Sequence, residues 1–125
     1  MNSGNRKNFI PLHYEMTKEG RLIAATTFKY SWRFQLGEKI HTVEFVLNNI
    51  FGTKEILVDG QRKTEIDTVG AFLSDDINIE FYVDTELINL FAKDNEYDLK
   101  VRKQLFSLML KESKKNLEKF IFRKK

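Results

Sequence analysis

Hydrophobic and polar residues alternate along much of this chain, and the alternation is clearest between residues 27 and 36. Every second position there is aromatic or aliphatic, and the positions between them carry polar side chains. The apolar positions are Phe28, Tyr30, Trp32, Phe34 and Leu36. Because successive side chains of a β-strand point to opposite faces, this period of two predicts a strand with one buried face.

The same pattern recurs at short intervals, separated by Gly, Asn and Asp residues that favour turns. Asp59-Gly60 is the clearest of these turns, because both residue types tolerate the positive φ of a tight hairpin. Further strands are predicted at residues 12–18, 40–47, 54–58, 61–65, 77–83, 87–92, 97–101 and 105–110, with a weaker candidate at 68–73. Short strands at this spacing predict an all-β fold, either a barrel or, as we prefer, an antiparallel β-sandwich of about eight or nine strands.

The alternation stops near the C-terminus. Leu117, Phe120 and Ile121 are spaced by three and four positions, which predicts a short C-terminal helix of one or two turns within residues 111–125. Ser113 or Asn116 would cap this helix. We expect residues 1–10 to be a disordered leader, residues 11–122 to form a single β-sandwich domain, and residues 123–125 to be a basic tail.

The composition limits the chemistry that the chain can perform. The sequence contains no Cys, which excludes disulfides, zinc–thiolate sites and thiol catalysis. No apolar run approaches the roughly 20 residues that a membrane helix needs. The polar N-terminus also lacks the apolar segment of a secretory signal. We therefore expect a cytoplasmic protein without a membrane span.

Positive charge is concentrated at the C-terminal end. Residues 100–125 hold 10 Lys and Arg against 2 Glu, a net charge of +8, whereas residues 1–99 hold 11 against 16 Asp and Glu, a net charge of −5. Such an end would attract an acidic protein surface, RNA or anionic lipid, or it would simply keep the domain soluble. The candidate contacts for an acidic surface are Lys114, Lys115, Lys119 and Arg123.

Tyr82 is a separate candidate contact for a protein partner. It falls on the strand face opposite Phe81, so it either points to solvent as an anchor or lies buried against the helical tail. Trp32 and the Phe residues offer rings on which nucleic-acid bases could stack. They alternate regularly with polar residues, however, as the buried face of a sheet does, so we do not expect a nucleic-acid partner.

The two histidines, His13 and His41, do not indicate a catalytic or metal site. No Cys accompanies them, and no local spacing supplies further ligands. By its period, His41 shares a face with Val43 and Phe45. We interpret it as a histidine at the edge of the core, hydrogen-bonded to a neighbouring residue.

The remaining candidates for chemistry are also weak. Asp75 and Asp76 are adjacent, so they would point apart in a strand or be solvated in a turn, and neither arrangement gives paired catalytic carboxylates. Gly52-Thr53-Lys54 lacks the earlier glycine and the following helix of a phosphate loop. We expect a non-enzymatic protein that needs neither a metal nor another cofactor.

An ordered set of residues between positions 32 and 60 resembles the Fas apoptotic inhibitory molecule family. The set comprises Trp32, Leu36, His41, Val43, Glu44, Phe45, Gly52, Val58, Asp59 and Gly60, and weaker similarity extends over residues 28–120. The resemblance implies a β-sandwich in which these residues are mainly structural. It also implies a role in regulating apoptosis signalling and in protection against protein aggregation. Members of that family usually carry two such domains, whereas this chain has room for one.

We therefore predict a protein-interaction domain that presents a sheet face, an edge strand or its basic end to a protein partner whose identity stays open. Two alternatives remain. The chain could be a small structural subunit of a large macromolecular assembly. It could also be a pleckstrin-homology-like module of about seven strands and a C-terminal helix that binds a lipid or a peptide.

Overall fold

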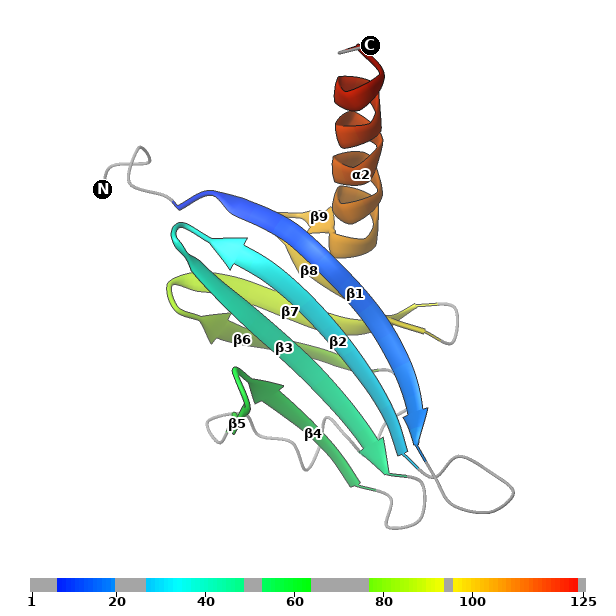
Figure 1. Cartoon of the computed structure of the whole chain (residues 1–125). Coiled ribbons are helices and arrows are strands. Elements are labelled where there is room, and N and C mark those ends of the chain that lie inside the picture. Colours follow the sequence, from blue (N-terminus) through cyan, green and yellow to red (C-terminus); the bar gives the residue numbers. More distant parts are fainter. Residues whose placement is uncertain (1–6, 20–26, 49–52, 64–76, 94–95, 124–125) are drawn as a thin grey trace. The chain divides into compact units, whose positions relative to one another are not determined.

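The chain consists of β-strands and one C-terminal helix, and it divides into two units, residues 1–63 and 64–125 (Figure 1). The computed structural model describes residues 7–19, 27–48, 53–63, 77–93 and 96–123. Nine strands in these residues form two antiparallel sheets, so the predicted all-β class is confirmed. Within the described residues, no helix is long and apolar enough to cross a membrane.

The first sheet belongs to residues 1–63 and follows the order of the chain. Its strands are β1 (Phe9–Glu19), β2 (Thr27–Leu36), β3 (Lys39–Asn48), β4 (Thr53–Val58) and β5 (Gln61–Arg62), in the order β1-β2-β3-β4-β5. The observed β2 has the predicted bounds. Trp32, at its centre, is paired with Tyr14 of β1 and with Val43 of β3.

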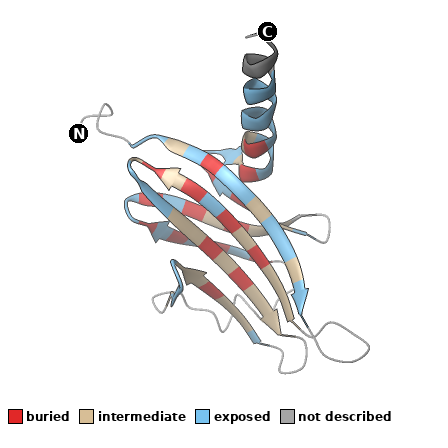
Figure 2. Cartoon of the chain, viewed as in Figure 1, coloured by how far each residue is buried: buried red, intermediate tan, exposed pale blue. Residues whose placement is uncertain are grey.

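One face of the first sheet is a buried aromatic surface, as the alternation predicts (Figure 2). The ring of Trp32 is 1% exposed and lies between Tyr14 and Tyr30, at centroid distances of 5.7 and 6.3 Å. Phe9 stacks on Phe34 at 4.7 Å. The buried apolar residues of β2–β4 are Tyr30, Trp32, Phe34, Leu36, Val43, Phe45 and Ile56.

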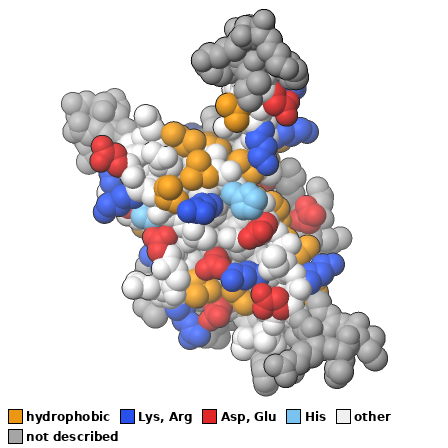
Figure 3. All heavy atoms as spheres, viewed as in Figure 1, with side chains coloured by type: hydrophobic (Ala, Val, Ile, Leu, Met, Phe, Trp, Pro, Cys, Tyr) orange, Lys and Arg blue, Asp and Glu red, His pale blue; other side chains and the backbone are white. Residues whose placement is uncertain are grey.

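The opposite face of the first sheet is mixed: acidic and basic side chains are interspersed with hydrophobic ones, among them the exposed Ile10 and Ile40 (Figure 3). Lys29 Nζ lies 2.9 Å from Glu44 Oε2, and Arg62 lies 2.7 Å from Glu55 Oε2. The hydrogen bond and the negative charge of Glu44 raise the pKa of Lys29 above its ordinary value. These exposed pairs neutralise one another, so this face presents no strong field of either sign.

The second sheet belongs to residues 64–125. Its strands are β6 (Asn78–Val83), β7 (Glu86–Lys93), β8 (Glu96–Val101) and β9 (Gln104–Leu105), in the order β6-β7-β8-β9. One face is again buried and apolar. It carries Ile79, Phe81, Val83, Ile88, Leu90, Leu99 and Val101.

Helix α2 (Phe106–Arg123) corrects three predictions, the first being the cap at Ser113 or Asn116, because both residues lie inside the helix. The strand expected at residues 105–110 is wrong, because β9 ends at Leu105 and the helix begins at the next residue. The helix is also longer than the predicted one or two turns. Phe106 and Leu110 are buried at a spacing of four, whereas Leu108 is 58% exposed, so the true period here is that of a helix.

Asp98, in β8, explains why the helix begins where it does. Its Oδ2 accepts a hydrogen bond of 2.6 Å from the Ser107 hydroxyl, and its Oδ1 accepts bonds from the Ser107 and Leu99 amides at 3.3 and 2.8 Å. The first turn of a helix has amide groups without partners inside the helix, and a carboxylate there also interacts favourably with the helix dipole. The first turn of α2 contains no acidic residue, so Asp98 takes this role from a neighbouring strand.

Some predicted boundaries fall elsewhere or lie outside the described residues. β1 begins at Phe9, inside the stretch expected to be a leader, and α2 extends to Arg123 at the start of the expected basic tail. The candidate strand at residues 68–73 lies outside the described residues. The expectation of one domain stays a prediction, beside the division into two units.

Candidate functional site

The motif histidine is held by the motif aspartate at the β4–β5 turn. His41 Nδ1 lies 2.7 Å from Asp59 Oδ2, and Asp59 Oδ1 accepts a 2.8 Å bond from the Thr42 amide. Because a carboxylate only accepts, Nδ1 carries the shared proton. His41 Nε2 is buried and has no hydrogen-bond partner among the residues that the structure describes, and the imidazole lies 5.9 Å from the Phe34 ring. The interpretation of His41 as a hydrogen-bonded histidine at the core edge is confirmed.

The Asp59-Gly60 turn has the predicted geometry. Both residues have positive φ, 53° and 83°, and the Asp59 amide donates a 2.8 Å bond to the Thr42 carbonyl. Asp59 therefore fixes the turn through its backbone and orients His41 through its side chain. These hydrogen bonds join β3 to the β4–β5 turn, and we interpret them as structural. We call His41, Thr42 and Asp59 the clasp.

We expect Asp59→Ala to lower the free energy of unfolding by about 1–2 kcal/mol, because it removes two hydrogen bonds and places an alanine at positive φ. Asp59→Asn keeps an oxygen for the Thr42 amide and tolerates this φ, so its loss should stay below about 1 kcal/mol. Urea denaturation of both variants measures the difference. Equal losses would show that the charge of Asp59, and not the turn geometry, is what stabilises the clasp.

The other motif residues that the structure describes belong to the first sheet. Trp32, Leu36 and Phe45 are buried, Glu44 pairs with Lys29, and Val58 is half-buried beside the turn. Val43 is buried on the same face. Gly52 lies outside the described residues. The placement of these residues agrees with the structural role that we expect for them.

The weaker chemical candidates do not come together in the described part of the chain. His13 Nε2 lies 3.8 Å from Glu15 on exposed β1, which is a surface pair. No group of three or more His, Asp or Glu within the described residues could hold a metal ion. Asp75 and Asp76 lie outside those residues.

The solvent-facing side of the second sheet carries exposed apolar side chains. Tyr82 of β6 is 59% exposed and is paired directly with Leu87 of β7, which is 41% exposed. Of the two alternatives left open for Tyr82, the structure therefore shows the outward one, and not burial against the C-terminal helix. We call Tyr82 and Leu87 the apolar pair.

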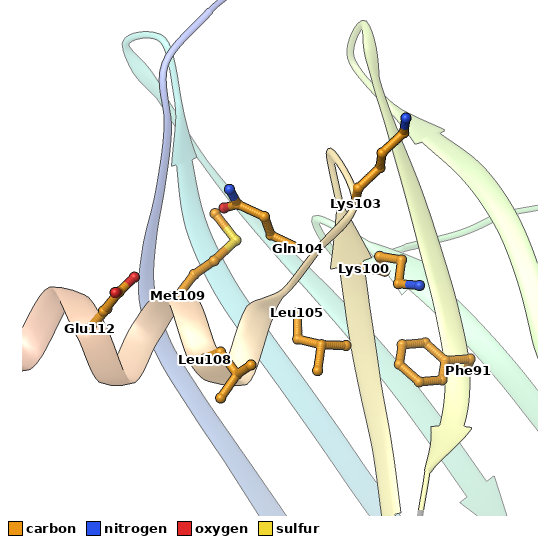
Figure 4. A pocket seen from close by; sticks show the side chains of 8 residues that line it. All are labelled: Phe91, Lys100, Lys103, Gln104, Leu105, Leu108, Met109 and Glu112. Carbon is orange, nitrogen blue, oxygen red and sulfur yellow. The ribbon is translucent and has the colours of Figure 1, made fainter.

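An open groove lies on the same side of this sheet, where β7, β8 and β9 meet the start of α2 (Figure 4). Its volume is about 590 Å³. The apolar part of the lining comes from Phe91, Leu105, Leu108 and Met109, and the polar part from Lys100, Lys103, Gln104 and Glu112. Lys100 turns toward Phe91, with Nζ 5.9 Å from the ring centroid. The groove therefore combines an apolar lining with the ammonium group of Lys100, and Lys103 adds a positive charge at its margin (Figure 4).

The β8–β9 turn that supplies Lys103 has an uncommon conformation. Arg102 and Lys103 both have positive φ, 53° and 67°, where long side chains are disfavoured and Asn-Gly would cost least. Arg102 has a structural reason to be there, because its guanidinium binds the buried Glu86 at 2.7 Å. Lys103 has no such partner within the described residues, and it is one of the residues that line the groove.

The predicted basic contacts lie along α2. Lys114 and Lys115 are exposed on the helix. Lys119 and Arg123 also belong to it, but their side chains lie outside the description. Lys100 and Lys103, which line the groove, were not among the predicted contacts. The sequence gives them no distinguishing signal, because each is one lysine in a basic stretch, and only the fold places them beside Phe91.

Comparisons with protein-family models, with curated proteins and with solved structures find no match to this chain. The resemblance to the Fas apoptotic inhibitory molecule family therefore stays a hypothesis based on the motif residues. Support for a function therefore comes from the chemistry of the described surfaces. Of these, the solvent-facing side of the second sheet combines exposed apolar side chains with a groove.

Proposed function

We propose that this chain is a non-enzymatic protein-interaction module that binds its partner with the solvent-facing side of the second sheet. The observation that carries the proposal is the exposure of the apolar pair, Tyr82 and Leu87, on directly paired positions of β6 and β7. An exposed tyrosine beside an aliphatic residue is a common anchor of protein interfaces. Burial of these two side chains by a partner would gain apolar contact with little loss of rotamer freedom.

The other surfaces considered for partner binding fit less well. β1 is the edge strand of the first sheet, but it has a register shift between Pro11 and His13. Such a bulge, together with a proline and the charged residues Glu15, Lys18 and Glu19, hinders pairing with another strand. The mixed face of the first sheet carries ion pairs, and its exposed Ile10 and Ile40 are not paired directly with each other because β2 lies between their strands. These features favour binding through the second sheet.

The resemblance to the Fas apoptotic inhibitory molecule family supports a cytoplasmic module that regulates apoptosis signalling or protects proteins against aggregation. This part of the proposal rests on the motif alone. The motif residues would hold the fold, and the solvent-facing side of the second sheet would supply the specificity. A module of this kind needs no cofactor.

The proposal is tested by capturing partners from the native source with the full chain and with Tyr82→Ala/Leu87→Ala. We expect at least one protein enriched by the full chain to be reduced about tenfold by the double variant, as for loss of an interface anchor. Ile40→Ala, which removes a 51% exposed apolar side chain from the first sheet, is the matched control. Circular dichroism checks that all three proteins fold alike.

Two outcomes would refute the proposed surface. Partners could be captured equally by all three proteins, which would place the interface elsewhere. Alternatively, size-exclusion chromatography of the native source could show the chain only within a large particle that the double variant still joins. That result would instead indicate a structural subunit that assembles through another surface.

A further inference from the structure

We infer that the groove between β7, β8, β9 and α2 binds an acidic segment of a partner protein, with a bulky apolar side chain of that segment against Phe91 and Leu108. This inference rests on the proposed function and adds the chemistry of the partner. The groove lies on the side of the sheet that carries the apolar pair. A segment that crosses the groove would therefore continue an interface centred on Tyr82 and Leu87.

The charges of the lining select a negative ligand. Lys100 brings its ammonium group to the groove beside Phe91, and Lys103 adds a second positive charge at the margin, with its Nζ pointing away from Phe91 (Figure 4). No acidic side chain in the described part of the chain forms an ion pair with either lysine. Carboxylates of a partner would make charge-assisted bonds with both lysines. The Lys100 stem is already held over Phe91, so it loses less side-chain freedom on binding.

The shape and the single acidic group favour a protein segment over other anions. The groove is open to solvent, so a small apolar molecule would stay partly exposed in it, whereas a protein segment can cover it and extend beyond it. Glu112 on the α2 side would repel the continuous phosphates of a nucleic acid. A protein segment can place its acidic residues at the lysines and leave a polar or basic group beside Glu112.

The backbone at Lys103 supports this assignment independently. A lysine at φ 67° is less favourable than glycine, and the structure shows no ion pair of Lys103 within the described residues that would offset this strain. Strained backbone of this kind is characteristic of functional sites. Lys103→Gly should therefore raise the denaturation midpoint of the protein while it weakens binding in the groove.

The test uses a fluorescein-labelled octapeptide with a central phenylalanine flanked by glutamates, and its counterpart with glutamines. By fluorescence anisotropy with the full chain, we expect the glutamate peptide to bind about tenfold or more tightly than the glutamine peptide. Lys100→Glu/Lys103→Glu should weaken it by about tenfold. Lys114→Glu/Lys115→Glu makes the same change in net charge on exposed α2 positions outside the groove lining, and it should change binding less than about twofold.

Several results would overturn the inference. These are equal binding of the two peptides, equal loss in both charge-reversed variants, or no binding at millimolar peptide. Tighter binding of single-stranded RNA or of vesicles containing anionic phospholipid, lost in Lys100→Glu/Lys103→Glu, would assign the lysines to phosphates instead. If native partners depend on Tyr82 and Leu87 but not on Lys100 and Lys103, the inference fails while the proposed function stands.

Discussion

Trp32→Ala is expected to lower the free energy of unfolding of the first sheet by about 3–5 kcal/mol, the cost of truncating a large buried aromatic residue. The indole is 1% exposed and has tyrosine rings on both sides, at 5.7 and 6.3 Å. Removal of the ring leaves a cavity that Tyr14 and Tyr30 cannot fill without leaving their own contacts. Typical domains have only about 5–15 kcal/mol in total, so the variant should be close to unfolding.

Guanidinium denaturation followed by far-UV circular dichroism measures this loss. Fluorescence is unsuitable because Trp32 is the only tryptophan of the chain. Ile40→Ala is the control within the same sheet. It truncates a side chain that is 51% exposed and should change the stability by less than about 0.5 kcal/mol. A loss below about 1 kcal/mol for Trp32→Ala would contradict the packing of the indole.

The success of the alternation as a guide has a physical reason. In β2 and β3, one face is buried and the other is in contact with solvent. Apolar and polar residues therefore alternate along these strands, and the sequence alone shows this pattern. The Asp59-Gly60 turn is equally local, since its geometry depends on the φ preferences of two adjacent residues. Such short-range rules predict β2 with its observed bounds and β3 to within one residue at each end.

The C-terminal segment shows where such rules fail. Phe106, Leu108 and Leu110 alternate like a strand, but Phe106 and Leu110 are also four residues apart, as on one face of a helix. Over so short a stretch the two periods cannot be separated. The structure resolves them through Asp98, which lies eight residues before Phe106 and belongs to another strand. Local sequence preferences cannot predict a hydrogen bond between side chains of two different elements.

The groove could not be predicted from the sequence for a related reason. Lys100, Lys103 and Phe91 come from β8, the β8–β9 turn and β7, and none has a spacing that signals binding. Strand alternation places Tyr82 on the face opposite Phe81, but it leaves the exposure of Tyr82 open, because a covering helix would bury the side chain. The groove forms because α2 begins directly after β9. A strand at residues 105–110, as the alternation predicts, would not form it.

The hydrogen bonds between Asp98 and Ser107 lead to the second large effect. We expect Asp98→Ala to lower the free energy of unfolding by about 2–3 kcal/mol. The substitution leaves the Ser107 hydroxyl and the amides of Ser107 and Leu99 without their acceptor, in a site where Asp98 is only 7% exposed. A buried donor that loses its partner costs about 1–3 kcal/mol, and loss of a helix cap costs about 0.5–2 kcal/mol. These costs overlap, because the same bonds are involved in both.

Asp98→Asn is the matched control, because its amide oxygen can still accept from the two amide groups and the Ser107 hydroxyl can accept from its NH₂. It should retain more than half of the stability that Asp98→Ala loses, and Ser107→Ala should lose about 1 kcal/mol. Helicity at 222 nm, measured below the main unfolding transition, distinguishes fraying of α2 from global unfolding. If α2 begins at Phe106 because of Asp98, the helical signal must fall in Asp98→Ala before the sheets unfold. An unchanged signal with unchanged stability would mean that helix propensity alone starts α2, and that the hydrogen bonds to Ser107 merely accompany it.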